Sequence, residues 1–427
     1  MQEQFKLRTR QNPPYQTGTQ AAPVSRWAMF SALRYRNFAF YWFGQLSSVM
    51  GQNMQWVAQS WLVLYLTDSP AMLGLAGLAS SVPTIVFALV GGAAADRADR
   101  QMLLRVTQLA QALLYGLLAT IIVMGLVQTW HVMVFAFFAG LIRAFDQPTR
   151  QALVPHLIPR HELPNAVALG SSVWQLSRLA GPAIAGMLIA FFDVGVTLYV
   201  ASIGFLVFVM LLAFIRIEKV AGPEPASRGM LNDLFDGLRF IRRNELFYTL
   251  IAMTFLDSIF GMSYTVLLPV FARDILDVGS TGYGLLQTTS GVGALGGTLV
   301  VVWLSHSGRR GLQALIGAAS FGLLIVAFAF SPWYPLSLAL ILLMGLANQT
   351  YMTTVNTVLQ MHLPDELRGR VMGIYGLTYS LVPLGGTVSG TVAEFAGAPV
   401  AVAMGGLLVA CMAGFVFLRL PRVRNLE

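Results

Sequence analysis

The feature that most constrains this chain is the way its basic residues are sorted between hydrophobic stretches. About twelve long apolar stretches recur along the 427 residues, and nearly all the arginine and lysine falls in alternate gaps between them. Short loops rich in arginine and lysine stay on the cytoplasmic side of a bilayer, so this sorting records the orientation of a membrane protein. The sequence therefore predicts an all-α membrane protein that crosses the bilayer many times.

The expected spans follow from bilayer thickness, because each span needs roughly 20 mostly apolar residues. We expect twelve transmembrane helices, at 38–66, 71–95, 102–127, 130–152, 164–190, 195–215, 246–271, 281–304, 312–330, 334–360, 369–394 and 398–418. The gaps then divide by charge, and Arg273 is the only basic residue in the gaps of one side. Both termini and the long central connection are expected on the other, cytoplasmic side.

These spans divide the chain into five expected regions. They are a cytoplasmic tail at 1–36, a six-helix bundle at 37–215, a cytoplasmic linker at 216–245, a second six-helix bundle at 246–418 and a cytoplasmic tail at 419–427. Within the linker, apolar residues recur at helical spacing between Leu231 and Ile241 and charged residues take much of the remaining surface. We expect an amphipathic helix there, lying on the cytoplasmic face.

Composition excludes several classes of protein. Hydrophobic residues make up 56% of the chain and charged residues 11%, whereas soluble domains carry about 25% charged residues. The net charge of +8 is spread over many short loops and forms no single patch, so we expect no nucleic-acid partner. Cys411 is the only cysteine, which excludes an intrachain disulfide.

Sequence patterns of enzymes and of ATP-driven pumps are absent. The chain has no Gly-x-x-x-x-Gly-Lys-Ser/Thr run, no His-Glu-x-x-His pair and no cysteine cluster, and its five histidines are scattered. We therefore expect no catalytic residue, no metal and no cofactor. The energy source would then be an ion gradient.

Residues 92–100 carry the first family resemblance. They read Gly-Ala-Ala-Ala-Asp-Arg-Ala-Asp-Arg, between the second and third expected spans. This resembles the signature Gly-x-x-x-Asp-Arg-x-Gly-Arg of the major facilitator superfamily, with Asp99 at the position of the second glycine. The departure puts the tight turn of the family in doubt at this position.

A cytoplasmic latch is the function that this resemblance implies. Gly92 would let its helix approach a neighbour closely, and Asp96 would lie against the positive N-terminus of another helix. Arg97 and Arg100 would bind carboxylates on an adjacent helix, and the resemblance makes Asp146 their partner. The alternative is that the two arginines only set the topology.

Further segments resemble one branch of the superfamily. Residues 181–186 read Gly-Pro-Ala-Ile-Ala-Gly, and Gly181, Pro182 and Gly186 resemble the Gly-Pro element in the fifth helix of drug–proton antiporters, where they would form a hinge or a close crossing with the eighth span. Residues 144–152, 163–169 and 178–182 resemble the bacterial enterobactin-exporter-like transporters. The likeness covers nearly the whole chain and implies the major facilitator fold, with two pseudo-symmetric six-helix bundles. It also implies proton-driven export of siderophores or lipophilic drugs.

Charged residues at membrane depth are functional candidates, because burying a charge there is costly. Asp257 lies near the middle of its span and is our first candidate for proton coupling, and Asp146 is the second; the alternative is a carboxylate held by neighbours with no role in turnover. Arg143, Asp146 and Arg150 share one helix face, where they can neutralise one another. Arg143 and Arg178 would meet an anionic group of a substrate or form internal ion pairs.

Polar and aromatic side chains inside the spans are candidate substrate contacts. In lipid such residues must face protein or water. The first span carries a stripe of them, and the seventh and tenth spans carry others: Gln45, Gln52, Gln55, Trp56, Gln59, Tyr264, Asn348 and Tyr351. The alternative is that they join packed helices by hydrogen bonds.

Together these patterns predict a monomeric, proton-coupled exporter of a lipophilic or amphipathic small molecule in the bacterial inner membrane. The main alternative is a symporter or facilitator that imports a small nutrient, which would favour a more charged cavity. A membrane-embedded enzyme and a sensor without transport activity are two further alternatives.

Overall fold

The computed structural model describes residues 28–216, 230–304 and 308–426, and these residues form helices with no strand among them. Ten segments of this described part are long and apolar enough to cross a membrane. Two more long helical segments, α1 (Arg36–Thr67) and the run from α13 (Asp365–Gly376) to α14 (Val382–Ala396), are not among the ten. The first carries the polar stripe, and a 3₁₀ turn at Leu377–Leu381 interrupts the second.

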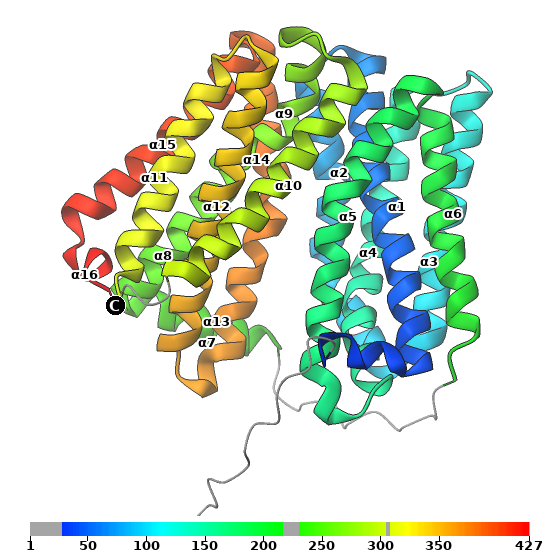
Figure 1. Cartoon of the computed structure of the whole chain (residues 1–427), viewed down its shortest axis with the longest axis horizontal. Helices are drawn as coiled ribbons and strands as arrows, with labels where there is room; N and C mark the ends of the chain where they lie inside the picture. Colours follow the sequence, from blue (N-terminus) through cyan, green and yellow to red (C-terminus); the bar gives the residue numbers. More distant parts are fainter. Residues whose placement is uncertain (1–27, 217–229, 305–307, 427) are drawn as a thin grey trace, which may run out of the picture.

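The helices form two groups that follow the order of the chain (Figure 1). The first group contains α1, α2 (Pro70–Arg97), α3 (Arg100–Val123), α4 (Thr129–Leu153), α5 (Leu163–Phe191) and α6 (Val194–Ala213). The second contains α7 (Met230–Arg243), α8 (Glu245–Leu256), α9 (Tyr264–Val270), α10 (Gly279–Leu304), α11 (Arg310–Ala329), α12 (Tyr334–His362), α13, α14, α15 (Ala398–Arg419) and α16 (Pro421–Arg424).

Two extensive helix contacts join the groups, α5 with α10 and α2 with α14. Both depend on glycine. A Cβ on Gly284 of α10 would collide with the carbonyl oxygen of Pro182, and one on Gly74 of α2 would collide with the backbone of Thr387 in α14. Without a side chain at these positions, two helix backbones can come into direct van der Waals contact.

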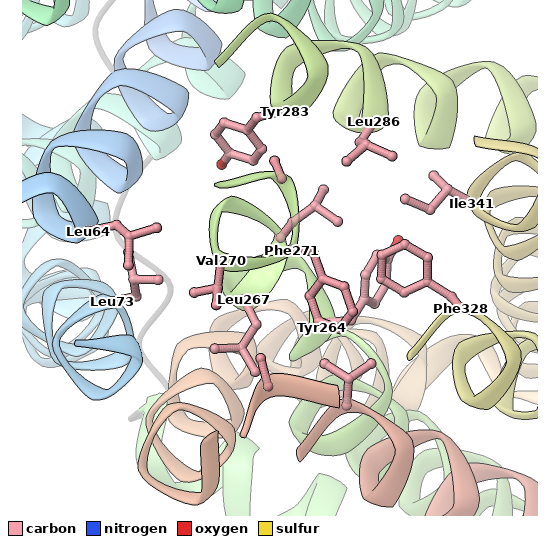
Figure 2. Close-up of a cluster of buried hydrophobic side chains, with 14 of the residues drawn as sticks. Leu64, Leu73, Tyr264, Leu267, Val270, Phe271, Tyr283, Leu286, Phe328 and Ile341 are labelled. Atoms are coloured by element: carbon pink, nitrogen blue, oxygen red, sulfur yellow. The ribbon is translucent and has the colours of Figure 1, made fainter. Parts of the chain in front are cut away.

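An apolar core continues across the boundary between the groups at the end of the molecule where α9 lies (Figure 2). Leu64 of α1 and Leu73 of α2 point towards Leu267 and Val270, all of them buried. At the opposite end, where α7 and α16 lie, the ribbons of the two groups diverge (Figure 1). The structure is therefore closed at the end of α9.

Two segments refine the predicted spans. The expected seventh span is a helix interrupted by two π-helical segments, η4 (Asp257–Gly261) and η5 (Phe271–Ile275). The expected amphipathic helix corresponds to α7, whose Asp236 pairs with Arg370 of α13 at 3.2 Å. The rest of the predicted linker, at 217–229, and residues 1–27 of the predicted tail lie outside the described residues.

Candidate functional site

Asp257 lies at the first residue of the π-helical segment η4, where α8 ends. Its side chain is buried, and Oδ2 accepts a hydrogen bond from Nδ2 of Asn348 in α12 at 3.2 Å. Oδ1 has no hydrogen-bond partner among the described residues. A π-helical turn leaves the regular hydrogen-bond ladder and is found frequently at functional sites.

A glycine lies directly beside the free oxygen of Asp257. A Cβ on Gly261, one π turn later, would lie 2.7 Å from Oδ1 of Asp257 and 3.1 Å from the ring of Phe321. Gly261 therefore keeps a small space beside the free oxygen, between η4, α11 and α15. Tyr351 is one turn from Asn348, and its buried hydroxyl also has no partner in the described part of the chain.

Asp146 has a different environment. Its Oδ1 accepts hydrogen bonds from Thr107 at 2.9 Å and from Gln108 at 2.5 Å, and its Oδ2 accepts one from Nε of Arg150 at 2.5 Å. Arg150 also donates to Ser48 of α1 at 2.8 Å. All five side chains are buried, so the network joins α1, α3 and α4 with both carboxylate oxygens occupied.

The expected self-neutralisation on α4 therefore occurs between Asp146 and Arg150, without Arg143. Nε of Arg143 is buried and has no hydrogen-bond partner among the described residues. Arg178 on α5 is half-buried, and the described residues offer it no ion pair. Neither Arg143 nor Arg178 therefore has an ion-pair partner in the part of the chain that the structure describes.

The predicted latch segment runs from the last turns of α2 to the first residue of α3, and residues 96–99 within it are exposed. Nε of Arg100 donates to the carbonyl oxygen of Ala95 at 3.2 Å, and its guanidinium lies against His156. Within the described ranges neither Asp96 nor Arg97 has an ion-pair partner. The expected pair of Asp146 with Arg97 or Arg100 is not formed in this structure.

Two expectations about this segment need correction. A Cβ on Gly92 would meet no heavy atom within 4 Å, whereas one on Gly91 would collide with the carbonyl oxygen of Ala144 in α4. The close approach therefore belongs to Gly91. Asp99 has a negative φ of −62°, so this turn does not need glycine, and its carboxylate caps α3 by accepting from the backbone of Gln101 and Met102.

The Gly-Pro element lies in the crossing of α5 and α10. A Cβ on Gly186 would lie 2.5 Å from the carbonyl oxygen of Ser280, and the hydroxyl of Ser280 donates to the carbonyl oxygen of Gly186 at 3.2 Å. A Cβ on Gly181 would lie 2.7 Å from Asn53 of α1. Since α5 continues through Pro182 to Phe191, the geometry here is that of a close crossing, one of the two alternatives.

The predicted substrate contacts fall into two sets. Gln45, Gln55, Tyr264 and Tyr351 are buried between helices, and Gln55 donates to Gln59 at 2.5 Å. The side chains that retain exposure are Gln52, Trp56, Gln59 and Asn348.

The partners that Arg273 and Glu394 find at the α9 end were not predicted from the sequence. Nη1 of Arg273 donates to Oδ1 of Asp68 at 2.7 Å and to the carbonyl oxygen of Leu64 at 3.1 Å. Glu394 of α14 accepts from the hydroxyl of Ser69 at 2.8 Å. The lone arginine of that side was the available signal, but its partner lies 205 residues away in the sequence.

Curated relatives that resemble the chain over most of its length are transporters. It is 28% identical to the multidrug efflux pump Tap of Mycolicibacterium fortuitum, over 90% of this chain and 96% of that protein. It is 27% identical to the staphyloferrin A transporter of Staphylococcus aureus, over 80% and 86%. It is 23% identical to macrolide efflux protein A of Streptococcus pyogenes, over 87% and 93%.

Solved structures support the same fold. A bacterial homolog of the human lysosomal transporter Spinster, in an inward-facing and unoccupied conformation, superposes with a TM-score of 0.72 at 14% identity, over 92% of this chain and 98% of that one. The nucleoside transporter NupG superposes with a TM-score of 0.69 at 13% identity, over 90% and 98%. The family model of transmembrane secretion effectors matches residues 27–427. The chain is thus a multi-pass membrane protein that belongs to the transmembrane secretion effector family of major facilitator transporters.

Proposed function

We propose that the protein exports a lipophilic or amphipathic small molecule from the bacterial cytoplasm in exchange for protons, with Asp257 as the proton carrier. The observation that carries the proposal is the buried Asp257 carboxyl group, which has one oxygen without a partner in the described residues. Because burial stabilises the neutral form of a carboxyl group, such a group can load and unload a proton as its surroundings change. The efflux pumps among the relatives support the direction.

The hydrogen-bond networks favour Asp257 over Asp146. A carboxylate that accepts three hydrogen bonds is stabilised in its charged form, and Asp146 accepts them from Thr107, Gln108 and Arg150. Asp257 accepts one, from Asn348. We assign Asp146 a structural role in holding α1, α3 and α4 together.

The proposal includes twelve spans, with α1 and the α13–α14 segment added to the ten candidates. An even number places both termini on the same side, which the charge pattern assigns to the cytoplasm. The protein would then work as a monomer in the inner membrane, by rocking of the two helix groups about a central site. The polar contacts of Arg273 and Glu394 would hold the outer side shut in the described state.

Transport into everted membrane vesicles tests the coupling. With an acidified lumen, we expect the vesicles to accumulate ethidium, a lipophilic cation, and Asp257→Asn to abolish accumulation that depends on the pH gradient while ethidium still binds. Asp193→Asn is the matched control, since an asparagine there can still cap α6 by accepting from the backbone of Val196. Gradient-driven accumulation by the Asp257→Asn variant would refute the assignment. Substrate movement in the opposite direction would favour the importer.

Single cysteines test the topology after Cys411→Ser. Asp96 and Met124 lie at opposite ends of the first helix group, near the end of α2 and at the end of α3, and both are exposed. A membrane-impermeant thiol reagent should label Met124→Cys in intact cells, and Asp96→Cys only after permeabilisation. The reverse pattern would overturn the orientation.

A further inference from the structure

A groove of 350 Å³ is lined by residues of α11 and α15, two packed helices at the outer edge of the second helix group. Its lining is apolar and includes Ile316 and Ala319 of α11 with Gly414, Phe417 and Leu418 of α15. A Cβ on Gly414 would meet no heavy atom within 4 Å, so the wall is open there. The groove has the chemistry and the location to hold a hydrocarbon chain from the surrounding lipid.

The end of α15 that lines the groove leads into α16 (Figure 1), and arginines cluster in the sequence there, with Arg419 at the end of α15 and Arg424 in α16. The guanidinium carbon of Arg424 lies 5.3 Å from the ring centroid of Phe417, which lines the groove. Arg419 follows the lining residue Leu418 and is exposed. In the described part of the chain neither arginine has a carboxylate within ion-pair distance.

A third arginine at this end does have a carboxylate partner. Arg422 lies with Arg424 in α16 and pairs with Glu245 of α8 at 3.2 Å. Its charge is thereby offset within the protein. Arg419 and Arg424 have no such carboxylate among the described residues and follow the lining residues of the apolar groove. They lie at the end of α15 that the charge pattern assigns to the cytoplasmic side, where lipid headgroups would lie.

We propose that this groove is a binding site for an anionic phospholipid. One acyl chain would occupy the groove, and the phosphate would accept hydrogen bonds from Arg419 and Arg424. A zwitterionic lipid fits the groove equally well, but its own ammonium group offsets the phosphate, so the arginines select the net negative headgroup. The site is separate from the proposed transport path through Asp257 and would persist if that proposal failed.

The single cysteine of the chain provides a probe for this site. Cys411 is exposed on α15 and lies three residues before Gly414 and seven before Leu418, a spacing that places all three on one helix face. A bimane fluorophore on Cys411 of the full-length protein is quenched on contact by lipids with brominated acyl chains. We would reconstitute the labelled protein in phosphatidylcholine vesicles that contain a small fraction of either brominated phosphatidylglycerol or brominated phosphatidylcholine.

The expected result is a preference for the anionic lipid. Each basic residue near a membrane surface attracts it by about fivefold, so brominated phosphatidylglycerol should quench at a fraction at least about fivefold lower. Arg419→Ala/Arg424→Ala should remove the preference, whereas Arg422→Ala should retain it. Gly414→Leu should reduce quenching by both lipids. Equal quenching of the unsubstituted protein by the two lipids would overturn the proposal, as would loss of the preference in Arg422→Ala alone.

Discussion

The buried ion pair of Asp146 and Arg150 should behave as one energetic unit. Arg150→Met removes the Nε–Oδ2 bond of 2.5 Å and the 2.8 Å bond to Ser48, and it leaves a buried carboxylate without its counter-charge. Breaking a buried pair from one side costs about 3–5 kcal/mol. Asp146→Asn leaves the guanidinium of Arg150 against the ring of Phe208 and bound to Ser48, so we expect a loss of about 3 kcal/mol.

The double variant distinguishes a coupled pair from two independent contacts. Asp146→Asn/Arg150→Met removes both charges, and the asparagine amide oxygen can still accept from Thr107 or Gln108. We expect a loss well below the sum of the single losses, with a coupling energy of about 3 kcal/mol. The free energy of unfolding would be measured by SDS titration of the purified protein in mixed micelles. Additive losses would refute the reasoning.

Four other predictions follow from the packing and the polar contacts. Gly91→Leu should prevent stable insertion by collision with Ala144, whereas Gly92→Leu should express normally, as measured by the yield of monodisperse protein; equal yields would contradict the packing. Asp99→Ala should lower stability by about 1 kcal/mol through loss of the α3 cap, and Asp99→Asn should not, by SDS titration. Gly284→Leu should abolish transport by separating α5 from α10, while Gly170→Leu in α5, where a Cβ would meet no heavy atom within 4 Å, should not. Arg273→Ala should raise thiol labelling of a cysteine at Ser69 by up to about fivefold, because an exposed ion pair is worth about 1 kcal/mol or less; unchanged labelling would exclude Arg273 as an outer contact.

The site was partly predictable, and the reason lies in what its residues depend on. The membrane depth of Asp257 follows from its place in an apolar stretch, so counting residues finds it. Asn348, 91 residues away, and the space beside Gly261 follow from the way α12 and α11 pack around the π turn. The contrast between Asp257 and Asp146 depends on such partners, and no local pattern reports them.

The sequence by itself determined that the chain spans a membrane many times, which family it belongs to, and where charges enter the apolar stretches. These properties depend on the order of residue types along the chain. A span must be apolar over the thickness of the bilayer, and arginine and lysine in each short loop set the side on which that loop lies. Only the tertiary structure decided which glycine carries a helix contact, since Gly91 and Gly92 differ by one step of rotation about α2. It also decided that both carboxylate oxygens of Asp146 accept hydrogen bonds, whereas one oxygen of Asp257 has no partner among the described residues. It further decided that Arg273 forms an ion pair with Asp68, 205 residues away in the sequence. Hydrogen bonds and close packing depend on three-dimensional neighbours, and those exist only once the helices have assembled.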